Sequence, residues 1–87
     1  MQVVKRNGRV VDFDRQKIVD AISKANAEVE NTDQVSDATI NYIADSMVTF
    51  AANSREPVHI EDIQDKIEGL LMREGPEVAK CYIRYRY

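Results

Sequence analysis

Residues 3–18 read VVKRNGRVVDFDRQKI, and this stretch combines the pattern of a β-hairpin with the start of a helix. Two pairs of valines flank an Asn7-Gly8 dipeptide. This dipeptide is the strongest short signal for a hairpin, because a type I′ turn needs positive φ angles that Asn and Gly tolerate. A two-stranded hairpin is only marginally stable by itself, so we expect it to pack against helices.

The residues after the hairpin predict a helix from about Arg15 to Ala27. Asp14 is a good N-cap residue, and Phe13 and Ile18 occupy the two positions of a hydrophobic staple around it. Apolar residues then recur at helical spacing on one face, namely Ile18, Ala21, Ile22 and Ala25. The helix should therefore bury this face against the rest of the molecule.

Three more helices are indicated by apolar residues spaced three and four apart. The second is expected over roughly Gln34–Ala52, after a polar break at 31–33 that can cap it. His59 stands at the capping position of the third, and Gly75 ends that helix before a fourth from about Pro76 to Tyr85. The predicted fold class is α+β: a small antiparallel β-hairpin lid, with room for a third short strand, on a four-helix bundle.

The composition argues against several classes of protein. The 87 residues include no apolar run of about 18, so no membrane span or signal peptide is expected and a cytoplasmic protein is favoured. Cys81, the single cysteine, is expected in the core because it shares the apolar stripe of the last helix with Val78, Tyr82 and Tyr85. The sequence has no Ser/His/Asp or Cys/His signature, metal cluster or glycine-rich phosphate loop, so we expect no catalytic and no metal-binding residues.

The net charge of −3 is unevenly distributed along the chain. Residues 1–17 contain five basic and two acidic side chains, a net +3, and residues 80–87 contain three basic side chains and no acidic one, again +3. Residues 18–79 contain four basic and thirteen acidic side chains, a net −9. The two basic ends are either ordinary solvated surfaces or parts of one anion-binding surface, and charge alone favours neither.

The N-terminal cations favour the second interpretation. Lys5 and Arg6 flank the hairpin turn and Lys17 lies in the first turn of the helix, so all three can converge on one phosphate chain. Unpaired N–H groups and the helix dipole also favour an anion there, while arginine offers bidentate contacts and lysine a mobile charge. The last helix adds aromatic residues that can stack on a base among further cations: Tyr82, Tyr85 and Tyr87 with Lys80, Arg84 and Arg86.

Two motifs together resemble a known module. The first is V-V-K-R-N-G-x-x-x-x-F-D-x-x-K-I-x-x-A-I from Val3, and the second is V-A-K-x-Y-I-x-Y-R from Val78. Both are similar to the ATP-cone domain, which forms the N-terminal allosteric part of ribonucleotide reductases and part of a bacterial repressor of their genes. The second motif is most like that of the anaerobic, class III ribonucleoside-triphosphate reductases. The resemblance covers nearly the whole chain and implies one ATP-cone domain over residues 1–87.

The resemblance also implies which residues bind the nucleotide. In ATP cones the Lys-Arg pair of the first strand and turn, here Lys5 and Arg6, contacts the phosphates, as does the lysine of the first helix, here Lys17. Relatives often have serine or threonine and histidine where this chain has Ile60 and Gln64. The other implied residues wall the pocket, form the hairpin turn, or lie on the third and last helices: Val3, Val4, Asn7, Gly8, Ile18, Ile60, Gln64, Tyr82, Tyr85 and Arg86.

The function implied by the resemblance is allosteric. ATP in the cone keeps the reductase active and dATP switches it off, often through a change of oligomeric state, while the chemistry belongs to a separate catalytic body. The resemblance implies that this chain binds ATP and dATP and partners such a catalytic body, without catalysing a reaction itself. Whether Mg²⁺ accompanies the nucleotide stays open.

Two alternatives remain at the level of sequence. The first is the ATP-cone part of the repressor, which would bind DNA. The acidic total charge argues against it, as does the single cysteine, since the repressor carries a four-cysteine zinc ribbon. The second is a helical interaction module whose basic ends are incidental.

Overall fold

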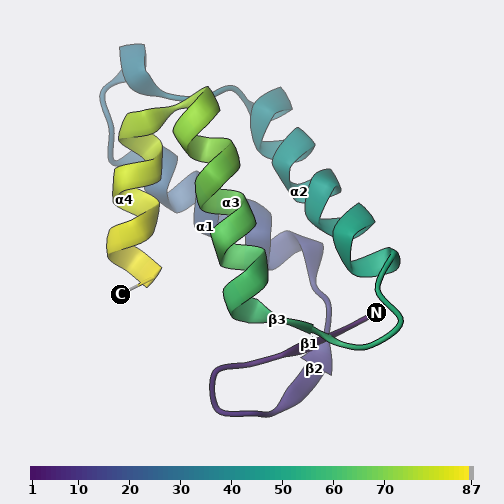
Figure 1. Ribbon diagram of the computed structural model, residues 1–87. Coiled ribbons are helices and arrows are strands. Elements are labelled where there is room, and N and C mark those ends of the chain that lie inside the picture. Colours follow the sequence, from purple (N-terminus) through teal and green to yellow (C-terminus); the bar gives the residue numbers. More distant parts are fainter. Residues whose placement is uncertain (87) are drawn as a thin grey trace.

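The computed structural model describes residues 1–86, and Figure 1 shows four helices with a small sheet at one end of them. The predicted α+β class is confirmed within this range. The stacking role suggested for Tyr87 concerns a residue outside the described range. The elements, in chain order, are β1 (Gln2–Val4), β2 (Val10–Asp12), α1 (Arg15–Ala27), the short 3-10 helix η1 (Asn31–Asp33), α2 (Asp37–Ala52), β3 (Val58–His59), α3 (Ile60–Glu74) and α4 (Pro76–Arg86).

The sheet contains the third strand for which the sequence left room, and β1 lies in its centre. The strand order is β2-β1-β3. β1 pairs antiparallel with β2, with Val3 opposite Val11, and parallel with β3, with Val3 opposite Val58. Val3 is buried, as is Val58, so the paired strands β1 and β3 both contribute to the core.

The hairpin is confirmed, but the predicted type I′ turn is wrong. Such a turn needs positive φ at both central residues. Among the described residues only Gly8 has a positive φ, of 85°, so Asn7 does not adopt that conformation. The Gly8 N–H donates to the Lys5 carbonyl (2.9 Å) and the Lys5 N–H donates to the Arg9 carbonyl (2.8 Å). This is a three-residue loop closed by a glycine bulge, in which the Asn7 side chain accepts from the Arg9 N–H (3.0 Å).

Helix α1 begins and ends where the sequence predicts. The Asp14 carboxylate accepts a hydrogen bond from the Gln16 N–H (3.0 Å), which caps the helix. Ile18, Ile22 and Ala25 are buried as expected. Ala21, the fourth residue of the predicted face, is exposed because it lines the cavity described below.

Helix α2 begins three residues later than predicted, at Asp37 instead of Gln34. The side chain of Asn26 holds Val35 outside the helix, since it donates to the Val35 carbonyl (3.0 Å) and accepts from the Val35 N–H (2.9 Å). Ser36 then caps α2 by accepting from the Thr39 N–H (3.1 Å). The polar break at 31–33 forms η1 and not a cap.

The ends of α3 follow the sequence in position, but for different physical reasons. His59 is the N-cap residue, yet its side chain makes no capping hydrogen bond. Gly75 ends the helix with φ −160°, which any residue can adopt. Its lack of a side chain is needed for packing, because a Cβ at this position would lie 2.5 Å from Cγ1 of Val35.

The four helices share one hydrophobic core. α3 packs against α4, and α1 packs against both α2 and α4. Cys81 is buried in this core as predicted, but Tyr85 is 42% exposed, so its assignment to the buried stripe is wrong. Figure 1 shows that α1 and α3 begin, and α4 ends, at the end of the bundle that carries the sheet. No helix in the described range is long and apolar enough to cross a bilayer.

Candidate functional site

A cavity of about 440 Å³ lies between the sheet, the start of α1 and one face of α3. This volume is in the range of small-molecule sites. Segments far apart in the chain form its walls, and most residues of the predicted site are among them. The predicted residues that line it are Val3, Lys5, Arg6, Asn7, Lys17, Ile18, Ile60, Gln64 and Tyr82.

The interior of the cavity is apolar. Val3 and Ile18 line it from β1 and α1, and both are buried. The sequence analysis did not predict Ile63 and Ile67, which extend this apolar wall along α3, because their spacing is that of any core residue. Phe13, expected only as a staple residue, also contributes. A flat apolar group would be sheltered from water here.

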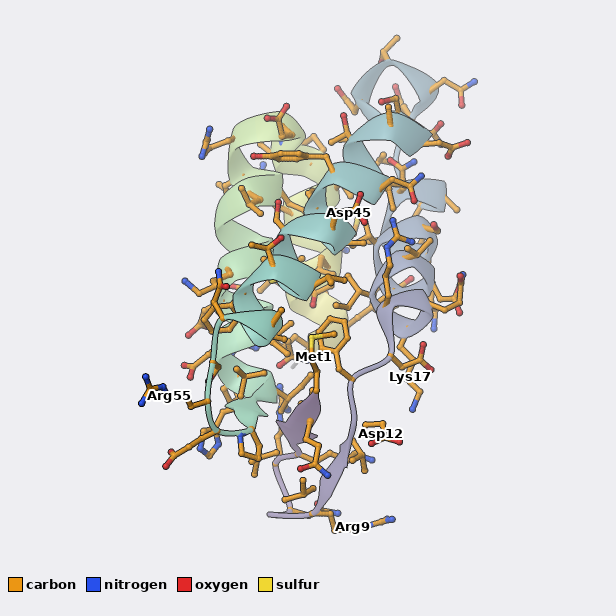
Figure 2. The ribbon with its side chains drawn as sticks, turned by 90° about the vertical axis from the view of Figure 1, so that its right-hand side faces the viewer. Met1, Arg9, Asp12, Lys17, Asp45 and Arg55 are labelled. Atoms are coloured by element: carbon orange, nitrogen blue, oxygen red, sulfur yellow. The ribbon has the colours of Figure 1, made fainter. Side chains whose placement is uncertain are left out.

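The rim of the cavity is charged. Lys5 on the hairpin and Lys17 on the first turn of α1 are exposed, and both line the cavity, so the two elements present their cations to one space. Figure 2 shows Lys17 and Asp12 at the junction of β2 and α1, with Arg9 at the far tip of the hairpin. Asp12 and Asp14 also line the cavity, which was not predicted, and Asp14 is engaged as the cap of α1.

Arg6 connects this rim to α3 and α4. Its Nε lies 2.5 Å from a carboxylate oxygen of Glu61, and its Nη2 donates to the side chain of Gln64 (3.2 Å). The same nitrogen donates to the backbone carbonyl of Arg86 (3.1 Å). The hairpin turn, the start of α3 and the end of α4 therefore meet at one guanidinium group.

Arg86, a predicted nucleotide contact, is held by carboxylates of α3. Its side chain is 3% exposed and forms ion pairs with Glu61 (2.5 Å), Asp65 (2.7 Å) and Glu68 (2.7 Å). The hydrogen bond from Arg86 is the main reason why the pKa of Glu61 is lowered, with smaller contributions from the charges of Arg6 and Arg86. The same carboxylates, Glu61 first, raise the pKa of Arg86.

The other predicted site residues lie elsewhere. Val4 and Gly8 line a neighbouring hollow beside His59 and not the main cavity. Tyr85 lies against α1, where its hydroxyl donates to Glu28 and its ring lies 4.7 Å from Nζ of Lys24.

The sequence allowed for both basic ends to face one pocket. Within residues 1–86, the N-terminal cations line the cavity and the cations of α4 do not. Lys80 pairs with Glu77 (3.0 Å), and Arg84 donates to Sγ of Cys81 (3.4 Å). Lys80 and Arg84 are four residues apart and therefore share an exposed face of α4, away from the buried Tyr82.

Tyr82 is the residue of α4 that lines the cavity. Burial raises its pKa from 10.0 to about 12. A tyrosine hydroxyl is protonated at neutral pH with or without this shift, so it can donate a hydrogen bond, while the ring adds to the apolar wall.

A small α+β domain whose cavity has an apolar interior and a rim with cations has the features expected of a domain that binds a small molecule with an apolar part and an anionic part. The ATP cone domain family matches residues 1–87. The chain therefore belongs to this family, which confirms the resemblance seen in its two motifs.

Curated relatives of the chain are ribonucleotide reductases. The chain is 40% identical, over 98% of its length, to the vitamin B12-dependent ribonucleoside-diphosphate reductase of Thermoplasma acidophilum. It is 35% and 34% identical, again over 98% of its length, to the anaerobic ribonucleoside-triphosphate reductases of Haemophilus influenzae and Escherichia coli. The chain spans only 11% to 12% of the length of these relatives. Because the chain belongs to the ATP cone domain family, its role is allosteric regulation by a nucleotide.

Proposed function

We propose that residues 1–87 form one regulatory domain that binds ATP and dATP in the cavity between the sheet, α1 and α3. ATP would act as the activator and dATP as the inhibitor of a ribonucleotide reductase. The observation that carries this proposal is the division of the cavity into an apolar interior and a rim with Lys5, Arg6 and Lys17. A base fits the first environment and a triphosphate fits the second.

The two nucleotides differ by one 2′-hydroxyl, so the domain needs a contact that only ATP makes. A hydrogen bond to a partly buried partner is worth about 1–2 kcal/mol, or roughly ten-fold in affinity. Tyr82 and Gln64 are polar groups of the lining that could provide it. Only such a difference in binding energy can shift a regulatory equilibrium.

The partner of this domain would be the catalytic body of a reductase, with a change of oligomeric state as the output. The support for this partner is the similarity to reductases that are far longer than the chain. Several cones in one assembly would multiply a small preference for one nucleotide into a usable switch.

Titration calorimetry of the folded chain with ATP and with dATP tests the proposal, with and without Mg²⁺. Lys5→Ala should weaken binding of both nucleotides by more than about ten-fold, because a charged contact to phosphate is lost. Lys80→Ala is the matched control, since Lys80 is exposed and pairs with Glu77 on another face. Absence of heat at millimolar nucleotide, with a folded domain, would reject the proposal. Equal losses for both variants would remove Lys5 from the site.

A further inference from the structure

We infer that Arg6 exchanges partners when a polyphosphate enters the cavity. Its guanidinium group releases Glu61 and the end of α4 and binds the phosphates instead. Occupancy of the site would thereby be coupled to the way in which the C-terminal end of α4 is held. The inference rests on the proposed function and adds a route by which binding is transmitted.

Glu61 is the shared partner in this arrangement. One of its carboxylate oxygens binds Nε of Arg6 at 2.5 Å and the other binds Nη2 of Arg86 at 2.5 Å. Arg6 also reaches past Glu61 to the backbone carbonyl of Arg86, at 3.1 Å. The guanidinium of Arg6 thus holds both a side chain of α3 and the last turn of α4.

The two arginines differ in how firmly they are held. The side chain of Arg86 is 3% exposed and has three carboxylate partners, whereas that of Arg6 is 49% exposed. Exposed ion pairs contribute little to stability, because water and salt screen them. A triphosphate, with several negative charges and bidentate oxygen pairs, can therefore compete for Arg6 but not for Arg86.

The cost of the exchange is small on the side of Glu61. When Arg6 leaves, the carboxylate keeps its ion pair with Arg86 and does not become an unpaired charge. The Arg86 carbonyl, in contrast, loses the donor that ties the end of α4 to the hairpin. By thermodynamic reciprocity, anything that holds the end of α4 against Arg6 must weaken nucleotide binding.

Two variants with the same change of charge test this exchange. Glu61→Gln removes the carboxylate that competes for Arg6, so ATP should bind about three- to five-fold more tightly, the upper end of what one exposed ion pair contributes. Asp65→Asn removes one carboxylate from the same helix, but the ion pair of Asp65 is with Arg86. The affinity of Asp65→Asn for ATP should therefore stay within about two-fold of the wild-type value at 0.15 M salt, where screening limits long-range effects. In an Arg6→Ala background the gain from Glu61→Gln should vanish.

A direct readout does not depend on these variants. The carbonyl carbon of Arg86 in the wild-type chain, followed by NMR during an ATP titration, should shift as its oxygen loses the Arg6 donor. An unshifted carbonyl at saturating ATP would overturn the inference while leaving the proposed function intact, as would equal affinity gains for Glu61→Gln and Asp65→Asn. A wild-type chain that is folded but binds no nucleotide would overturn the proposed function itself.

Discussion

Gly75 shows how a single missing side chain allows two segments to approach each other. A Cβ at this position would lie 2.5 Å from Cγ1 of the buried Val35. We expect Gly75→Ala to lower the free energy of unfolding by about 1–3 kcal/mol, the usual cost of overpacking a core. Gly69→Ala is the control, because nothing lies within 4 Å of its Cβ position in the middle of α3. Urea unfolding should show the control to be stabilised by up to about 1 kcal/mol through helix propensity, and a stable Gly75→Ala would contradict the packing argument.

Tyr82 makes a prediction about alkaline stability. Its pKa in the folded state, about 12, lies above the ordinary value of 10.0 because the ring is buried. The unfolded chain therefore loses this proton first, so the stabilisation is complete below pH 10 and is lost as the pH rises toward 12. The free energy of unfolding should fall by up to about 1.4 kcal/mol per pH unit in this window. In Tyr82→Phe the free energy of unfolding, measured by urea unfolding from pH 9.5 to 11, should decline less steeply. An unchanged slope would show that other groups cause the decline.

At the scale of elements, Asn26 at the end of α1 sets where α2 begins. Its side chain satisfies both backbone groups of Val35, at 2.9 Å and 3.0 Å. Asn26→Ala leaves a partly buried N–H and C=O without these bonds, which should cost about 2 kcal/mol of unfolding free energy. Asn26→Asp keeps the acceptor and loses the donor, so thermal and urea unfolding should place it between the wild type and Asn26→Ala. Equal stability of all three proteins would show that water replaces these bonds.

The elements that sequence predicts well are those with local signals. α1 starts and ends as expected because the Asp14 cap and the apolar period lie within the helix itself or beside it. The sequence predicts β3 only as a possible third strand without a position, since Val58 and His59 form a strand through their pairing with β1. The start of α2 is missed because Asn26, in another helix, decides the conformation of Val35.

The same division applies to the candidate site. Lys5, Arg6 and Lys17 come from one continuous stretch, so a hairpin followed by a capped helix brings them together without further information. The apolar wall from Ile63 and Ile67 cannot be told from ordinary core by spacing. The ion pairs of Arg86 depend on how α3 and α4 pack, which no local pattern encodes.

At the scale of the whole molecule, the ion cluster of Arg6, Glu61 and Arg86 joins the hairpin to the two C-terminal helices. The pKa of Glu61 is below its ordinary value of 4.5, chiefly because Arg86 donates to it. The unfolded chain takes up this proton first, so the stabilisation is present above pH 4.5 and is lost as the pH falls below that value.

Glu61→Gln should therefore be less stable than the wild type at pH 7, and the gap between the two should narrow as the pH is lowered from 5 to 3.5. Urea unfolding at several pH values measures this gap. Glu56→Gln, a change of an exposed residue outside the cluster, is the matched control and should follow the wild-type curve. A gap that stays constant with pH would show that the carboxylate charge of Glu61 does not stabilise the fold.

The central place of β1 in the sheet has a consequence for biosynthesis. β1 is translated before α1 and α2, but its parallel neighbour at residues 58–59 is translated only after them. Until then one edge of β1 carries unpaired backbone groups, and a hairpin alone is only marginally stable. β1 must therefore wait for the synthesis of residues 58–59 before its sheet can close, so closure of the sheet is a late event in the synthesis of this domain.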